Sequence, residues 1–356
     1  MERRKTTRGT AAAAYARFIG RRLLLSALVV FGVVVIVFFL SRVIPANPAA
    51  LWAGPHARPE DIAAAEAEFH LNEPWPVQFY YYILDLLSGD LGVSLRTHQP
   101  VLNDIARTLP PTLELITAAL LLALLIGIPL GIVSAVRQRT WADHGTRVIA
   151  TAGVSMPPFW LAVLLSLIFV TWLAVLPASG YVSDSVLVSY PMEWITGSAF
   201  INAVIQGNIP VLVDWFRHLV LPALVLAAYP VALVTRMVRT MMIEVLGENY
   251  IRTAQAYGLP RQKVVYRYAL KNAISPAIVA LGLSFAFALT GAFLIESIFA
   301  WPGIGQYAWY SAVSFDYPAI VGVALVVAIF YVAVNLVVDL IQGTLDRRIV
   351  LTKAEG

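Results

Sequence analysis

The residue types that most often carry out catalysis or hold metals are sparse in this sequence and do not group. It contains no cysteine, and none of its five histidines lies in an H-E-x-x-H pattern. Neither a phosphate-binding GxxxxGK[ST] loop nor a G-x-S-x-G nucleophile turn occurs in the chain. The sequence therefore predicts no catalytic site, metal site or cofactor, and a chain that does not itself hydrolyse ATP. The histidines are His56, His70, His98, His144 and His218.

A polar stretch between two apolar runs indicates a different role. ENYIRTAQAYGLPRQKVVYRYALKNAISP, residues 248–276, has a glycine suited to the left-handed residue that ends a helix, Gly258, and a proline suited to a new first turn, Pro260. These residues predict a helix, a sharp turn and a second helix, with small Ala254 and Ala256 presented to a closely approaching partner. A solvated loop that only fixes topology is the alternative. Its basic residues are Arg252, Arg261, Lys263, Arg267 and Lys271.

The elements that position this stretch are membrane spans. Charged residues make up 13% of the 356 residues and the mean hydropathy is +0.76, against about 25% charge in a soluble domain. Uncharged stretches of about 20 residues, enough to cross a bilayer, occur six times. We therefore expect an all-α membrane protein with six transmembrane helices. The expected spans are residues 23–41, 115–136, 148–176, 219–240, 273–295 and 319–338.

The distribution of basic residues predicts the orientation of these spans. With six spans and both termini in the cytoplasm, 20 of the 25 lysines and arginines lie on the inner side. A seventh span at 194–213 would move the basic stretch outside, so we expect that segment to lie on the outer surface. The inner parts are an N-terminal segment 1–22, a loop 241–272 (the basic loop) and a C-terminal tail 344–356. The outer arginines are Arg42, Arg58, Arg96, Arg107 and Arg217.

The N-terminus resembles a secretory signal, because it has a basic start followed by an apolar run. The uncharged run from Leu23 to Ser41 is 19 residues long, longer than a signal core, and more spans follow it. We interpret it as a retained first span in the cell membrane.

Two outer pieces are expected, an insertion at 45–111 and a segment at 177–218. The insertion carries eight acids against three arginines. It also holds an aromatic cluster that could meet a soluble partner, although lipid contact or packing is the favoured interpretation. The role of 177–218 is open. The aromatic residues are Trp75, Phe79, Tyr80, Tyr81 and Tyr82.

Carboxylates near span ends are the remaining polar candidates. Glu296 lies near the outer end of the fifth expected span, where it either orients an outer gate, contacts a partner or is solvated at the interface. Trp301 and Gly303 form the turn after it, and Trp301 suits an anchor at the membrane edge. Glu114 and Asp339 are expected to be paired or solvated at interfaces.

The order of these motifs resembles a known family. The chain is similar to the permease subunits of binding-protein-dependent ABC importers, in the branch that carries peptides and nickel, over some 330 residues. The resemblance covers the basic loop with its Ala254-x-x-x-Gly258-Leu259 pattern and continues through ESIFAWPGIGQ. Other matching stretches are RRLLLSALVVFGVVVIVFFLSRVIPANPA, SGDLGVSLRTHQPVLNDIARTLPPTLEL, GIPLGIVSAVRQ, SMPPFWLAVLL, LPASG and FRHLVLPALVLA.

The resemblance implies a type I ABC importer permease fold, with a permease core at 112–343. It implies that the basic loop carries a coupling helix that docks on a cytoplasmic ATPase, whose closure turns two paired permeases outward. It also implies partners: a second homologous permease, ATP-binding subunits and an extracytoplasmic substrate-binding protein, with no nucleic acid. The family's Glu-Ala-Ala motif is absent here, where Arg252 and Thr253 stand at its first positions, and Lys271 departs from the later motif. The coupling residues implied are Glu248, Tyr250, Arg252, Ala254, Ala256, Gly258 and Leu259.

The peptide branch predicts di- or oligopeptides as cargo, but nickel, glutathione or oligosaccharides are alternatives that the pore-lining residues do not separate. A secondary carrier or channel without an ATPase is an alternative of another class. It predicts ionisable residues in mid-span and often an inverted repeat, neither of which the sequence shows.

Overall fold

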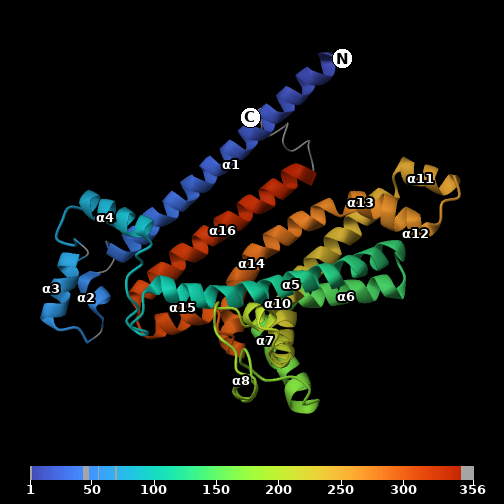
Figure 1. The fold of residues 1–356 in the computed structure, drawn as a ribbon. Coiled ribbons are helices and arrows are strands. Elements are labelled where there is room, and N and C mark those ends of the chain that lie inside the picture. The colour runs from blue at the N-terminus through green and yellow to red at the C-terminus, as the bar shows by residue number, and fades with distance from the viewer. Residues whose placement is uncertain (1, 43–47, 55, 69, 346–356) are drawn as a thin grey trace.

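The structure is a computed structural model that describes residues 2–42, 48–54, 56–68 and 70–345. These residues form helices joined by short connections, and their only β pairing is an isolated bridge between Val93 and Pro100. Figure 1 shows the long helices running side by side, with the helices of the basic loop at one end. The long helices are α1 (Glu2–Arg42), α5 (Val101–Val136), α10 (Ile209–Leu246), α14 (Ser275–Phe299) and α16 (Tyr317–Leu345).

Four single helices in the described part of the chain are long and apolar enough to cross a membrane. Several extend beyond the expected spans: α5 begins 14 residues earlier than the expected start, at Val101, and α10 begins at Ile209 and continues to Leu246. α14 adds a further apolar helix of 25 residues. The count of six spans stays a prediction. The four membrane-crossing stretches are Ile19–Phe39, Val101–Val136, Ile209–Leu246 and Tyr317–Leu340.

The third expected span, 148–176, is not one straight helix. α6 (Trp141–Ser155) ends before a proline pair, and α7 (Pro158–Ser166), followed by the π-helical stretch η1 (Leu167–Trp172), leaves at 111° to it. The cause is local, because a residue that precedes proline is pushed out of the helical region. Met156 and Pro157 accordingly have extended ψ values of 126° and 134°. The expected span 148–176 is therefore bent at this point, and its assignment as one span stays a prediction.

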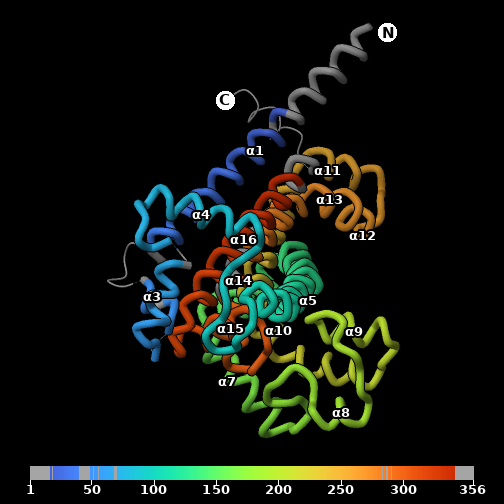
Figure 2. The backbone as a smooth tube through the Cα atoms, turned by 60° about the vertical axis from the view of Figure 1, so that its left-hand side comes forward, coloured from blue at the N-terminus to red at the C-terminus, as the bar shows by residue number. Residues whose placement is uncertain are grey.

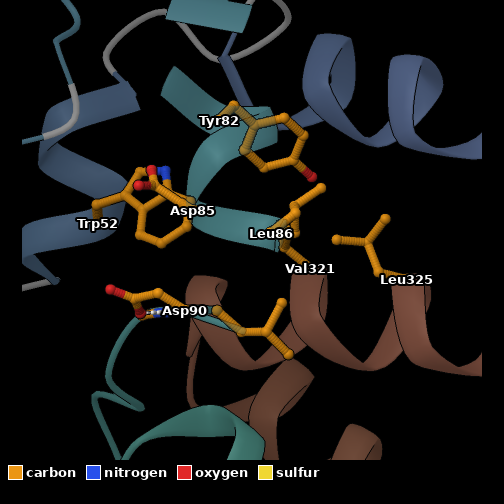
Figure 3. A pocket seen from close by; sticks show the side chains of 9 residues that line it. Trp52, Tyr82, Asp85, Leu86, Asp90, Val321 and Leu325 are labelled. Carbon is orange, nitrogen blue, oxygen red and sulfur yellow. Dashed lines mark hydrogen bonds between the residues drawn. The ribbon is translucent and has the colours of Figure 1, made fainter. Parts of the chain in front are cut away.

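The insertion before α5 packs on the first and last long helices. It contains α2 (Pro48–Ala53), α3 (Pro59–Glu68) and α4 (Trp75–Ser88). Phe38 of α1 lies 5.1 Å from the Phe79 ring and 5.6 Å from the Tyr82 ring of α4. Figure 3 shows Tyr82 and Leu86 of α4 facing Val321 and Leu325 of α16, with Trp52 of α2 beside them. Packing thus accounts for two members of the aromatic cluster, while Trp75, Tyr80 and Tyr81 stay exposed.

The segment 177–218 contains two short helices, α8 (Asp184–Ser189) and α9 (Ala199–Ile205), before α10 begins. The stretch 194–213 was expected not to span the membrane. Before α10 begins, it contains only α9, which has seven residues and is too short to cross a bilayer. Figure 2 shows α8 and α9 together at the end of the molecule opposite the basic loop. Their side of the membrane remains a prediction from the charge distribution.

The absence of cysteine makes that orientation directly testable. We expect a cysteine at position 58 or 195 to react with a membrane-impermeant maleimide added to spheroplasts, since both side chains are exposed on the predicted outer side. A cysteine at position 257, where the tyrosine is 84% exposed, should react only in inverted vesicles. Labelling of position 257 from outside would contradict the predicted orientation.

Candidate ATPase-coupling site and the carboxylates that brace the bundle

The basic loop folds as the expected helix, turn and second helix. α11 (Asn249–Ala256) ends at a turn in which Gly258 has a φ of +71°, and α12 (Arg261–Lys263) starts directly after Pro260. The Gly258 and Leu259 amides donate to the carbonyls of Gln255 and Ala254. Because a left-handed φ favours glycine, the residue type explains the turn. The second helix continues through η2 (Val264–Ala269) and α13 (Leu270–Ala273) into α14.

One face of α11 is buried within the chain. Ile251 is fully buried and Ala254 is 7% exposed. Both join a hydrophobic cluster with Val264 of η2 and with Val238 and Met242 of α10. The expectation that Ala254 is presented to a partner is therefore not met, because its small side chain allows close packing inside this chain.

The opposite face of α11 is exposed and carries aromatic and polar groups. Tyr257 is 84% exposed and Tyr250 is 40% exposed. The remaining exposed members of the predicted coupling set are Glu248, Arg252, Ala256 and Gly258, while Leu259 is half-buried. The second helix adds exposed Arg261, Lys263, Arg267 and Lys271.

Two further contacts connect the basic loop to the long helices. Arg261 donates from its guanidinium to the carbonyl of Val136, the last residue of α5, over 3.3 Å. Tyr250 of α11 accepts a hydrogen bond of 2.8 Å from the side chain of Asn272 in α13. The loop is thus held against α5 and α10 as well as against its own second half.

A buried ion pair joins α5, α6 and α10 near the same end. Arg239 of α10 donates to both Asp143 carboxylate oxygens, over 2.9 and 3.1 Å. Ser134 of α5 donates to the same carboxylate over 2.6 Å. Asp143 is 1% exposed, so its charge depends on these donors. Arg239 is one of the basic residues predicted on the inner side, and no short-range spacing in the sequence links it to Asp143.

Glu296 lies at the opposite end and is fully buried. Its carboxylate accepts hydrogen bonds from the Thr112 hydroxyl at 2.5 Å, the Gly305 amide at 2.7 Å and the Gln306 amide at 3.1 Å. It therefore joins α5, α14 and the start of α15 (Ile304–Val313). The interpretation of Glu296 as solvated at the interface was wrong.

Trp301 and Gly303 lie beside Glu296. We name Glu296, Thr112 of α5, Trp301 and Gly303 the Glu296 cluster. Trp301 is fully buried and donates from its indole to the Pro111 carbonyl over 2.8 Å, so it is not a membrane-edge anchor. A Cβ atom on Gly303 would lie 2.2 Å from the Glu296 carboxyl carbon. Glycine is therefore required here for close approach, although its φ of −91° is ordinary.

Glu114 and Asp339 are both paired. Glu114 of α5 accepts from Tyr181 at 2.7 Å, from Trp215 at 3.1 Å and from the Ser198 hydroxyl. Burial, and then the Glu114 charge, raises the pKa of Tyr181, so this phenol remains a neutral donor. Asp339 of α16 forms an ion pair with Arg22 of α1. These contacts tie the 177–218 segment to α5 and α10, and α1 to α16.

Comparison with known proteins places this arrangement in a family. The model of the binding-protein-dependent transport system inner membrane component matches residues 127–351, and the model of the N-terminal part of such membrane components matches residues 15–116. The chain belongs to this family. It is therefore a multi-pass membrane transport subunit and not an enzyme, as the sequence resemblance predicted.

Relatives of the permease align over nearly its whole length. It is 46% identical over 322 residues to the probable D,D-dipeptide transport system permease protein DdpB of Escherichia coli strain K12, covering 90% of this chain and 94% of that protein. It is 42% identical over 329 residues to the dipeptide transport system permease protein DppB of Alkalihalophilus pseudofirmus, covering 92% and 98% respectively. The DppB protein of Escherichia coli strain K12 is 38% identical over 334 residues, covering 94% and 98%.

Replacing Gly303 by alanine tests the packing of the Glu296 cluster in the permease. The added methyl group must displace a carboxylate that holds three hydrogen bonds, so we expect a loss of about 1–3 kcal/mol and a lower unfolding temperature. The measurement is thermal unfolding of the purified protein in detergent.

Gly291→Ala is the matched control for that change. Its Cβ atom would meet only Leu226 at 3.5 Å, an ordinary contact, in the same helix as Glu296. We expect its unfolding temperature to equal or exceed that of the wild type. Equal stability of the Gly303 and Gly291 variants would overturn the proposed close packing.

Proposed function

We propose that this permease is one half of the transmembrane channel of an ATP-driven importer of di- or oligopeptides. In this proposal it pairs with a second, homologous permease and takes cargo from an extracytoplasmic binding protein. The peptide assignment is supported by relatives at 38–46% identity that are named dipeptide permeases. The observation that carries the ATP-driven mechanism is the basic loop, which has one face packed on α10 and the other face exposed and charged.

The exposed face of α11 is the proposed docking surface for a cytoplasmic ATPase. When a partner displaces a helix, the displacement reaches the long helices of the permease only if that helix is firmly packed against them. Ile251 and Ala254 lie in one hydrophobic cluster with Val264 of η2 and with Val238 and Met242 of α10, and η2 contacts both α11 and α10. The Arg261 contact with α5 adds a second connection. Displacement of α11 by ATPase closure would therefore move α5 and α10 together.

The ion pair between Asp143 and Arg239 extends this connection to α6. It joins three helices in one hydrogen-bonded group near the basic loop. The bend after α6 then leaves α7 free to follow a different direction from α6. We infer that the inner ends of α5, α6 and α10 move as one body during alternating access.

The Glu296 cluster is proposed to position the outer gate. Glu296 and Trp301 are fully buried inside this chain, so they act on the gate through α15 rather than by touching a partner themselves. Since the carboxylate accepts from two amides at the start of α15, it fixes that helix to the outer end of α14. Thr112 fixes both to α5.

Gly258 allows the coupling role to be tested with a matched pair of variants. There is open space around its Cβ position, so only the left-handed backbone opposes a side chain. Asparagine tolerates this conformation, whereas β-branched valine is strained by about 1–2 kcal/mol or more. We expect Gly258→Asn to keep most of the peptide uptake per ATP hydrolysed and Gly258→Val to lower this ratio severalfold. Unchanged coupling in Gly258→Val would contradict the docking role of this turn.

Transport by the complete complex in proteoliposomes tests the function itself. With both permeases, the ATPase subunits and a peptide-loaded binding protein, we expect uptake of a radiolabelled dipeptide that depends on ATP. Parallel assays with nickel, glutathione and an oligosaccharide decide the cargo. Uptake by the lone chain without ATP would favour a carrier or channel and overturn the proposal.

A further inference from the structure

A buried carboxylate at the end of α15 brings two distant loops together. Asp316 is fully buried and accepts hydrogen bonds from the amides of Leu95 at 3.1 Å and Arg96 at 3.2 Å, and from the Ser94 hydroxyl. It also accepts from the Ala319 amide at the start of α16. The loop before α5 and the turn between α15 and α16 are thereby fixed to each other.

This arrangement displays an arginine on aromatic rings. The Arg96 guanidinium lies 5.6 Å from the centre of the Tyr307 ring and 5.7 Å from that of Tyr310. Tyr307 is held in place because its hydroxyl donates to Asp104 over 3.1 Å. Arg96 itself is exposed and makes no ion pair with any residue that the structure describes. Its charge is thus oriented by the rings and available to a partner.

The turn between α15 and α16 carries an exposed phenylalanine in a strained backbone conformation. Phe315 has a φ of +55° and is 70% exposed. A bulky residue is disfavoured in this left-handed region, where glycine or asparagine would relieve the strain, and water contact adds no compensation. Asp316, the next residue, holds the turn in this form.

A hollow lined by both polar and apolar residues lies beside Arg96. It has a volume of about 400 Å³. Its lining includes Arg96, His98 and Ser314 together with His56 and Asp61 from the α2–α3 region. Asp61 accepts from the Arg58 amide at the start of α3. We name Arg96, Tyr310, Phe315 and this hollow the Arg96 patch.

We propose that the Arg96 patch is a docking surface for a carboxylate-bearing loop of the extracytoplasmic binding protein; this inference rests on the proposed function. The exposed Arg96 guanidinium supports that occupant, because a partner carboxylate supplies the counter-charge that no ion pair with the described residues provides. The rest of the insertion at 45–111 is acidic, with eight acids against three arginines. An acidic loop is repelled by most of this surface and attracted at Arg96, which fixes the register of docking. Arginine and aromatic side chains are also the types that dominate interface energetics.

Arg58 supplies a matched control on the same outer piece. Its side chain is 78% exposed and pairs with Glu60 at 3.2 Å, so Arg58→Gln removes the same charge from a side chain that does not line the hollow and already has an ion-pair partner. Arg96→Gln removes the charge from the patch, Arg96→Lys keeps the charge without the planar guanidinium, and Phe315→Asn removes the ring while tolerating the left-handed backbone.

The assay titrates a purified, peptide-loaded binding protein of the same organism, chosen because it stimulates ATP hydrolysis by the wild-type complex in nanodiscs. The measured quantity is the concentration of binding protein that gives half-maximal stimulation of ATP hydrolysis. We expect Arg96→Gln to raise this concentration about tenfold and Arg58→Gln to raise it less than about twofold. Arg96→Lys should fall between Arg96→Gln and the wild type, and Phe315→Asn should also weaken docking. Raising the salt concentration should weaken the wild type more than Arg96→Gln.

Equal half-maximal concentrations for Arg96→Gln and Arg58→Gln would overturn the docking surface. A lower unfolding temperature of Arg96→Gln in nanodiscs, with no change in its half-maximal concentration, would also overturn it. That result would assign the patch to lipid contact or folding. If no binding protein stimulates the wild-type complex, the proposed function fails instead. The two failures are therefore distinguishable.

Discussion

A carboxylate that is buried away from water must receive its hydrogen bonds from the chain itself. The long helices satisfy their own backbone groups, and side-chain charges are the exception. Glu296, Asp316 and Asp143 are each nearly or fully buried, and each accepts at least two hydrogen bonds. In every case the donors belong to segments far apart in the sequence. Satisfying the charge and joining the segments are therefore one requirement.

The donors differ between the two ends of the bundle, and the difference bears on movement. Glu296 and Asp316 receive backbone amides and hydroxyls, which are fixed by the local chain. Asp143 also receives a hydroxyl and a backbone amide, but its donor on α10 is the arginine side chain of Arg239. Amide donors define one geometry, whereas a guanidinium on a flexible stem keeps its contact through a small displacement. In the proposed alternating-access mechanism, this difference would fix the outer end and let the inner end move while it stays connected.

The sequence predicted the long helices well and their interruptions less well. Apolar runs were enough to find the helices, because length and hydropathy decide membrane insertion. Pro157 and Pro158 lie inside the expected span 148–176, where two successive residues before proline produce a 111° bend. The turn at Gly258 was found because its residue types are specific to a left-handed helix end.

The same local reasoning could not place side chains whose role depends on distant partners. Trp301 matched the pattern of an interfacial anchor, yet its indole donates to a carbonyl 190 residues away. Ala254 looked like a surface adapted to a partner, but it is buried in a hydrophobic cluster that also holds residues of η2 and α10. Asp316 carried no signal, since Leu95 and Arg96 lie about 220 positions earlier. Composition and turn residues determine structure over a few positions. The contacts of Trp301, Ala254 and Asp316 form only when segments far apart in the sequence pack together.

Small residues allow α5 and α10 to pack closely against each other. Gly127 and Gly131 of α5 face Val234 and Val238 of α10, where a Cβ atom would lie 3.0 Å and 2.7 Å from the valine Cβ atoms. Val238 also belongs to the cluster that buries Ile251 and Ala254. In lipid, tight packing replaces the hydrophobic effect as the force between helices. Val238 thus takes part both in the close approach of α5 to α10 and in the hydrophobic cluster that buries α11, which makes α10 the physical link between the exposed loop and the core of the permease.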